Sequence, residues 1–136
     1  MPDKDARWIQ RFNNFDKALK LLENALQIPN PDVVQKAGII QFFEMCYELA
    51  WKILKDYLEY EGVSEVSTPR NAIKKAFELG IIENGRLWMD MISDRNLASH
   101  TYDEQKAIEL ESLIERKYFP LFKALWDDFK RKADAT

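Results

Sequence analysis

The sequence has very little cysteine and histidine, with one of each among its 136 residues. Cys46 alone cannot form a disulfide within the chain, which favours a reducing compartment. One thiol and one imidazole also exclude a Cys/His zinc site within one chain, and we expect neither a metal nor a cofactor. Histidine is the usual acid–base group near neutral pH, so such chemistry would centre on His100, and one protomer cannot supply two histidines.

Glycine and proline are also scarce, with four and five residues, and no stretch is repeated or of low complexity. We therefore expect a single domain over residues 1–136. No apolar run approaches the ~18 residues of a membrane span, and residues 1–12 lack the apolar core of a secretory signal. We expect a cytoplasmic protein without membrane contact. The formal net charge of −3 argues against wrapping nucleic acid by charge alone but permits a local basic pocket.

Apolar residues recur at helical spacing along the chain, and no segment shows the sustained period-two alternation of a strand. The first stripe steps by four and three residues through Trp8, Phe12, Phe15, Leu19, Leu22 and Leu26. The second segment, roughly 32–61, is apolar well beyond one stripe, so it should contact neighbours on more than one side.

Three further helical segments follow. The third begins with Thr68 as N-cap and Pro69 at the first helical position, and it stops at Gly80. The fourth ends near Arg95, and the fifth runs over roughly 103–132, where Pro120 should kink it. The sequence therefore predicts an all-α fold, an antiparallel up-and-down bundle of four long helices plus one short helix.

Arg95 extends an apolar stripe, because it shares a helical face with Trp88, Met91 and Ile92. An unpaired guanidinium is expensive to bury, so Arg95 must meet a carboxylate, a phosphate or a wet cleft at the helix end. In the plainer interpretation its partner is Asp90, Asp94 or a glutamate of the second helix.

Five residues later, His100 and Tyr102 lie at a predicted break between helices. Thr101 and Glu104 have the spacing of a capping box, and Asp103 is a rival N-cap. Asn96 suits the backbone of such a turn. Arg95, His100 and Tyr102 should then gather where one helix ends and the next begins. The structural alternative makes His100 a cap or an ordinary surface residue.

The string Arg95-Asn96-x3-His100-x-Tyr102 matches the Arg-x4–6-His motif of the HEPN superfamily. The strings Phe43-Glu44-x2-Tyr47-Glu48, Pro69-Arg70-x2-Ile73-x2-Ala76-Phe77 and Trp88-x-Asp90-Met91 extend this similarity. Together they resemble the nucleotidyltransferase substrate-binding branch of that superfamily, relatives of the HepT toxins, over nearly the whole chain.

This resemblance implies a helical homodimer that is encoded beside a minimal nucleotidyltransferase, binds it and handles nucleotide or RNA. In the toxin branch, the Arg and His of the motif form a metal-independent RNase site, which the partner silences by adenylylating the motif Tyr. Carried over, Arg95 and His100 are the candidate catalytic pair, Asn96 supports them and Tyr102 is the candidate modified residue. In the substrate-binding branch, the protein helps to bind the nucleotide substrate of the transferase.

The chemistry of RNA cleavage fits these residue types only in part. The reaction needs a base, an acid and positive charge beside the phosphorane. Arg95 suits bidentate phosphate contact, but one His100 cannot easily serve as base and acid at once. Two copies meeting across a two-fold axis would supply both. Three functions stay open: a transferase-binding subunit, an RNase toxin, and a nucleotide-binding module without catalysis.

Two clusters of basic residues can be interpreted either as ordinary protein surface or as functional contacts. Lys52 and Lys55 are spaced to pair with acidic neighbours on a solvated face, and alternatively they would line a nucleotide cleft. Arg70, Lys74 and Lys75 form the clearest local basic cluster, either an ordinary surface or a contact for a partner or phosphate.

The remaining candidates are mostly core residues. Trp51 and Trp88 have helical spacing typical of core aromatics, although either ring would also stack on a base. Cys46 lies on the buried stripe as a small apolar residue. Ser99 adjoins His100, but no third group orients a base for it, so we do not expect a nucleophilic serine.

Overall fold

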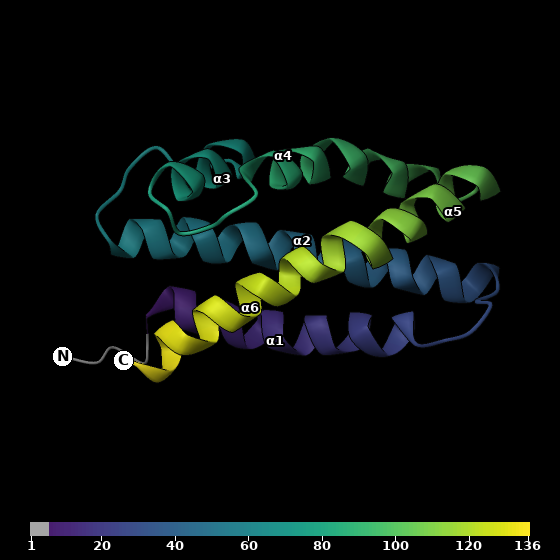
Figure 1. Cartoon of the computed structure of the whole chain (residues 1–136), viewed down its shortest axis with the longest axis horizontal. Helices are drawn as coiled ribbons and strands as arrows, with labels where there is room; N and C mark the ends of the chain where they lie inside the picture. Colours follow the sequence, from purple (N-terminus) through teal and green to yellow (C-terminus); the bar gives the residue numbers. More distant parts are fainter. Residues whose placement is uncertain (1–5) are drawn as a thin grey trace.

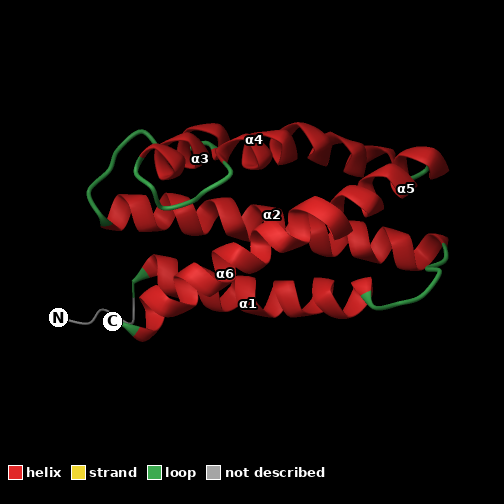
Figure 2. Ribbon diagram, in the orientation of Figure 1, coloured by secondary structure: helices red, strands yellow, loops and turns green. Residues whose placement is uncertain are grey.

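The computed structural model of the chain describes residues 6–136, and these form helices joined by short loops with no strand among them (Figure 1, Figure 2). Residues 1–5 lie outside the described residues. The expectations of no secretory signal in residues 1–12 and of one domain over residues 1–136 both include them. Along the described chain, no helix is both long and apolar enough to cross a bilayer. The elements are α1 (Arg7–Leu26), α2 (Val33–Tyr60), α3 (Pro69–Glu78), α4 (Gly85–Asp94), the 3-10 helix η1 (Arg95–His100), α5 (Glu104–Leu113), the π-helix η2 (Ile114–Tyr118) and α6 (Phe119–Asp134).

The arrangement confirms the predicted all-α bundle. Helix α4 continues into η1, and α5, η2 and α6 follow one another without a loop, so these runs act as two long helical segments beside α1 and α2. Helix α3 is the short one. In Figure 1, α1 lies on one side of α2, α3 and α4 lie on the other, and α6 crosses the bundle obliquely.

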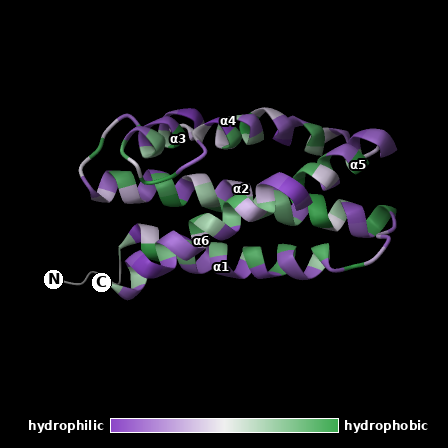
Figure 3. Cartoon of the chain, in the orientation of Figure 1, coloured by the Kyte–Doolittle hydropathy of each residue, from purple (hydrophilic) through white to green (hydrophobic). Residues whose placement is uncertain are grey.

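Helix α2 is the centre of the bundle, because it packs against α1, α3, α5, α6 and η1. Its buried residues include Phe43, Cys46, Tyr47, Ala50 and Leu54, which do not fall on one stripe. Hydrophobic and hydrophilic residues are therefore interleaved along it (Figure 3). Cys46 is a core residue, as its position predicts, and burial raises the pKa of its thiol to about 12.

The helix starts are fixed by local hydrogen bonds. The Asp32 carboxylate accepts from the backbone N–H of Gln35, whose side chain accepts from the N–H of Asp32, so a capping box begins α2. The Thr68 hydroxyl accepts from the N–H of Asn71, with Pro69 at the first helical position, and both predictions for α3 are confirmed. Gly80 follows α3 with φ +75°, a left-handed conformation that favours glycine.

The last helical segment departs from the predicted simple kink at Pro120. It is interrupted one turn earlier by the π-helix Ile114–Tyr118, and Pro120 lies in the first turn of α6. Proline has no N–H to donate to the carbonyl four residues before it, and its ring crowds that carbonyl. The wider π turn accommodates the loss, since the N–H of Phe119 donates to the carbonyl of Ile114.

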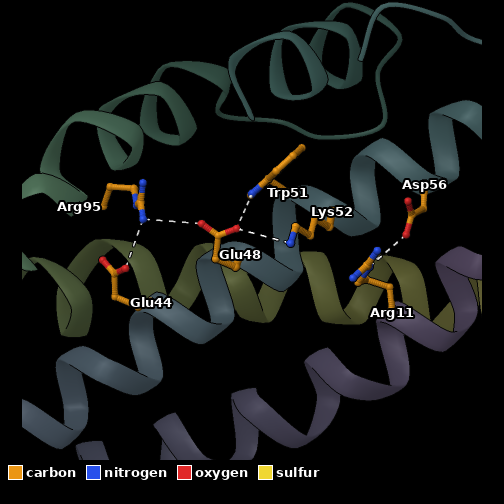
Figure 4. A network of polar contacts seen from close by, with 7 residues as sticks. All are labelled: Arg11, Glu44, Glu48, Trp51, Lys52, Asp56 and Arg95. Atoms are coloured by element: carbon orange, nitrogen blue, oxygen red, sulfur yellow. Dashed lines mark hydrogen bonds and ion pairs between the residues drawn. The ribbon is translucent and has the colours of Figure 1, made fainter. Parts of the chain in front are cut away.

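One charged side chain is buried in the contact between α1 and α2. The Asp56 carboxylate has no solvent-exposed surface, and it accepts a hydrogen bond from Arg11 Nε at 3.0 Å (Figure 4). Lys55 Nζ lies 3.7 Å from its other oxygen. Arg11 is partly exposed on α1. A buried carboxylate that lost its cation would retain its desolvation cost, so this pair sets how α1 and α2 meet.

Replacing Arg11 therefore tests the pair. Arg11→Met should lower the free energy of unfolding by about 3 kcal/mol, because it leaves the Asp56 charge buried beside only the more distant Lys55. Lys20→Met, which removes an exposed partner of Asp16 on the same helix, should change it by less than about 1 kcal/mol. Urea unfolding followed by circular dichroism measures both. Equal effects of the two variants would contradict the structural role of Arg11.

Candidate functional site

The motif residues lie on η1, the 3-10 helix between α4 and α5. Arg95 is its first residue and His100 its last, so both lie at a junction between helices, as predicted. A 3-10 helix rises ~2 Å per residue, which separates these two backbone positions by about 10 Å. Arg95 itself follows the last residue of α4 instead of belonging to the α-helix.

The Arg95 side chain turns toward α2. One of its terminal nitrogens lies 3.2 Å from a carboxylate oxygen of Glu44 and 3.6 Å from one of Glu48 (Figure 4). Its guanidinium carbon also lies 4.7 Å from the centroid of the Tyr47 ring. Glu44, Tyr47 and Glu48 share one face of α2 because they are three and four residues apart. Arg95 thus pairs with glutamates of the second helix, the third of its carboxylate alternatives.

Glu48 is in turn held by two neighbours on α2. Trp51 donates from its indole N–H to Glu48 at 3.2 Å, and Lys52 lies 3.8 Å from the same oxygen (Figure 4). Lys52 is therefore part of a charge-paired helix face, as is Lys55 with Glu59 at 2.9 Å. Trp51 is buried, which supports its interpretation as a core residue.

Asp94, next to Arg95, joins the motif to the π-helix. The buried Tyr118 hydroxyl donates a hydrogen bond to the Asp94 carboxylate. Burial, and then this carboxylate, raises the pKa of the Tyr118 phenol well above its ordinary value of about 10. The end of α4 is thereby anchored on the interruption between α5 and α6, directly beside the residue that begins the motif.

His100 and Tyr102 contact each other. Nδ1 of His100 lies 3.1 Å from the Tyr102 hydroxyl, and the rings meet edge to face with centroids 5.8 Å apart. Tyr102 is 84% exposed, so its hydroxyl and ring are both open to solvent. Asp103 is the N-cap of α5, accepting from the backbone N–H groups of Gln105 and Lys106, which settles its rivalry with Thr101.

One hollow borders η1, and a second lies beside it. The first, of about 370 Å³, is mostly polar and is lined by Ala37, Ile40, Gln41, Glu44, Arg95, Asn96, Ala98, Ser99 and Thr101. The second, of about 440 Å³, is mostly apolar and is lined by Val33, Lys36, Ala37, Ile40, Thr101, Tyr102, Glu104 and Ala107. Ala37, Ile40 and Thr101 line both, so the two hollows adjoin.

This geometry determines what the site can bind. Arg95 and Asn96 reach the polar hollow and can donate hydrogen bonds to an anion there. Glu44 lines the same hollow, so an anion would compete with it for Arg95. In residues 6–136, no group of three or more His, Cys, Asp or Glu side chains is arranged to hold a metal ion.

The sequence anticipated some of these contacts and missed others. It placed Arg95, Asn96, His100 and Tyr102 on one short segment, but no spacing rule identified Tyr118 as the partner of Asp94. The available signals were the aromatic Tyr118 two residues before Pro120 and the acidic residue at the end of the fourth helix.

The other candidates are accounted for by local contacts. Trp88 is buried, as its core interpretation requires. In the basic cluster of α3, Arg70 contacts the sulfur of Met89 at 3.8 Å and Lys75 lies 3.9 Å from Glu78. These contacts are typical of an ordinary charged surface.

Known proteins share this helical-bundle fold. A crystal structure of a Thermus thermophilus protein has a TM-score of 0.71 and 30% identity, covering 88% of this chain and 98% of that one. A Haemophilus influenzae protein named "Probable ribonuclease HepT" is 32% identical over 92 residues, which cover 62% of this chain and 63% of that relative's length. Residues 10–131 match the family described as "Nucleotidyltransferase substrate binding protein like". The chain belongs to this family, and the resemblance to the HepT-like branch is confirmed.

The link between Tyr118 and Asp94 predicts a specific pH dependence. The unfolded chain releases the phenol proton near pH 10, whereas the folded chain keeps it, so the stability that Tyr118 contributes is present below pH 10 and is lost as the pH rises further. Tyr118→Phe should reduce the fall in stability above pH 10 by up to about 1.4 kcal/mol per pH unit. Urea unfolding between pH 8 and 11 measures this. Parallel curves for the two proteins would contradict it.

Proposed function

We propose that this protein is a homodimeric, cytoplasmic subunit that binds a separately encoded minimal nucleotidyltransferase and helps to bind its nucleotide substrate. Membership of the nucleotidyltransferase substrate-binding family over residues 10–131 carries this proposal. The geometry supports it through the polar hollow, where Arg95 and Asn96 provide donors for a nucleotide phosphate.

The proposed dimer has a physical reason in η1. Because Arg95 and His100 start about 10 Å apart on one chain, and Arg95 is drawn toward Glu44 and Glu48, one copy offers a phosphate a single, partly neutralised cation. A second copy meeting the first at η1 would double both the arginines and the histidines around one cleft. That arrangement suits a protein with a net charge of −3.

A nucleotide-binding measurement tests the role of Arg95. Arg95→Ala should weaken binding of a nucleoside triphosphate to the complex with the transferase by about tenfold to a hundredfold, the range expected for a lost charge-assisted hydrogen bond. Arg86→Ala is the matched control, because Arg86 is an almost fully exposed arginine on α4. Isothermal titration of the purified complex gives both values. Equal affinities, or failure of the two proteins to purify together, would refute the proposal.

A second function is favoured by the likeness to the probable ribonuclease HepT. In this function Arg95 contacts the scissile phosphate, and the two His100 side chains of the proposed dimer share the proton transfers. One takes the proton of the attacking 2′-hydroxyl, and the other protonates the leaving oxygen. Tyr102 is then the residue whose hydroxyl attacks the α-phosphorus of ATP held by the transferase, so that AMP is bonded to the tyrosine oxygen and pyrophosphate leaves. Its exposed hydroxyl is accessible to such a reaction and contacts His100, so a bulky group there would disturb the proton-transfer residue.

An RNA-cleavage assay tests this second function in one experiment. The wild-type dimer should cleave RNA without added metal, and His100→Ala should reduce the rate at least a hundredfold. Incubation with the transferase and ATP should add AMP to Tyr102, seen by mass spectrometry, and stop cleavage, whereas Tyr102→Phe should gain no AMP. Light scattering of each sample gives its oligomeric state. Full activity in a monomer, or in His100→Ala, would exclude the mechanism.

A further inference from the structure

The apolar hollow between α2 and α5 has no part in the contacts described so far. Its lining includes the apolar side chains of Val33, Ala37, Ile40 and Ala107 and the ring of Tyr102. It shares Ala37 and Ile40 with the polar hollow that Arg95 and Asn96 line. A surface that is apolar on one side and polar and cationic on the other suits a ligand that has an apolar part joined to an anionic part.

We infer that the apolar hollow is a nucleobase subsite, which holds the base of the nucleotide or RNA residue whose phosphate meets Arg95. This inference rests on the proposed nucleotide-binding function and adds where the base lies. A nucleotide joins a flat, weakly polar base to a charged phosphate through one sugar. The two hollows offer matching environments side by side, and the shared wall places the sugar over Ala37 and Thr101.

Tyr102 supplies the aromatic surface that bases prefer. Tyr102 is 84% exposed, its hydroxyl lies 3.1 Å from Nδ1 of His100, and its side chain lines the hollow. A base that stacked on this ring would remove apolar area from water on both partners, and such stacking is tolerant of base identity.

The polar edge of a base would also find partners here. Lys36 and Glu104 lie on opposite elements, α2 and α5, and both line the hollow. A lysine ammonium donates to base carbonyl oxygens, and a carboxylate accepts from exocyclic amines. The subsite therefore binds a base mainly by stacking, and hydrogen bonds with these two side chains add to the binding.

Filling the hollow from an exposed position tests the inference without disturbing the core. Ala37 is an exposed residue of α2, so Ala37→Phe should fold normally and occupy the space of the base. Val34→Phe is the matched control, because Val34 is 79% exposed on the same helix and does not line the hollow. The probes are adenosine 5′-monophosphate and the 1-O-methyl riboside 5-phosphate, which has the same sugar and phosphate but no base. Dissociation constants come from NMR titration of the full-length protein in its native oligomer.

We expect wild type and Val34→Phe to bind the nucleotide about tenfold more tightly than the base-free probe. Ala37→Phe and Tyr102→Ala should erase most of this preference, whereas Tyr102→Phe, which keeps a ring, should retain it. Arg95→Ala should weaken both probes alike.

The other outcomes distinguish failure of the base subsite from failure of the proposed nucleotide-binding function. Equal affinity of wild type for both probes would overturn the base subsite and leave phosphate binding intact. Failure of both probes to bind would overturn the nucleotide-binding function itself. If Ala37→Phe instead dissociates the oligomer in light scattering, a second copy of the chain occupies the hollow and the inference is wrong.

Discussion

A helix that is apolar on more than one side is stable in water only when neighbours cover those sides, and α2 is such a helix. Contact with α1, α3, α5, α6 and η1 satisfies this requirement. The remaining fold follows from it, because each other segment needs only one apolar stripe that faces α2 or a neighbour of α2. The motif segment η1 is among the elements on α2, so the position of Arg95 and His100 is set by the same burial that forms the core.

The electrostatics of the site also depend on α2. Glu44 and Glu48 bring two carboxylates to one guanidinium, and Tyr47 offers its ring face to the same group. The arginine is thereby oriented and partly neutralised before any ligand arrives. A phosphate that binds here exchanges with a carboxylate for the same donors, so binding depends on contacts beyond charge. Neighbouring apolar surface provides such contacts without adding positive charge to an acidic protein.

The fold was largely predictable because its signals are local. Helical stripes, the Thr68–Pro69 start and the Gly80 stop all depend on residues within a few positions of one another. The contacts of the site were less predictable. Arg95 and Glu44 are 51 residues apart, and Tyr118 and Asp94 are 24 apart. Spacing could require that Arg95 find a carboxylate, but only the packing of η1 on α2 selects which one. Helical periodicity likewise could not predict that residues 95–100 form a 3-10 helix.

At the π turn Ile114–Tyr118, the number of residues in the chain matters to the structure as well as their types. A π turn amounts to an α-helix with one extra residue, and each residue rotates an α-helix by about 100°. The wider π turn takes up that residue within a single turn, so α5 and α6 keep nearly the relative rotation of one continuous α-helix. If the same residues were wound as a regular α-helix, the extra residue would turn α5 by that angle relative to α6. The face that α5 packs against α2, including the buried Ala107, would then point elsewhere.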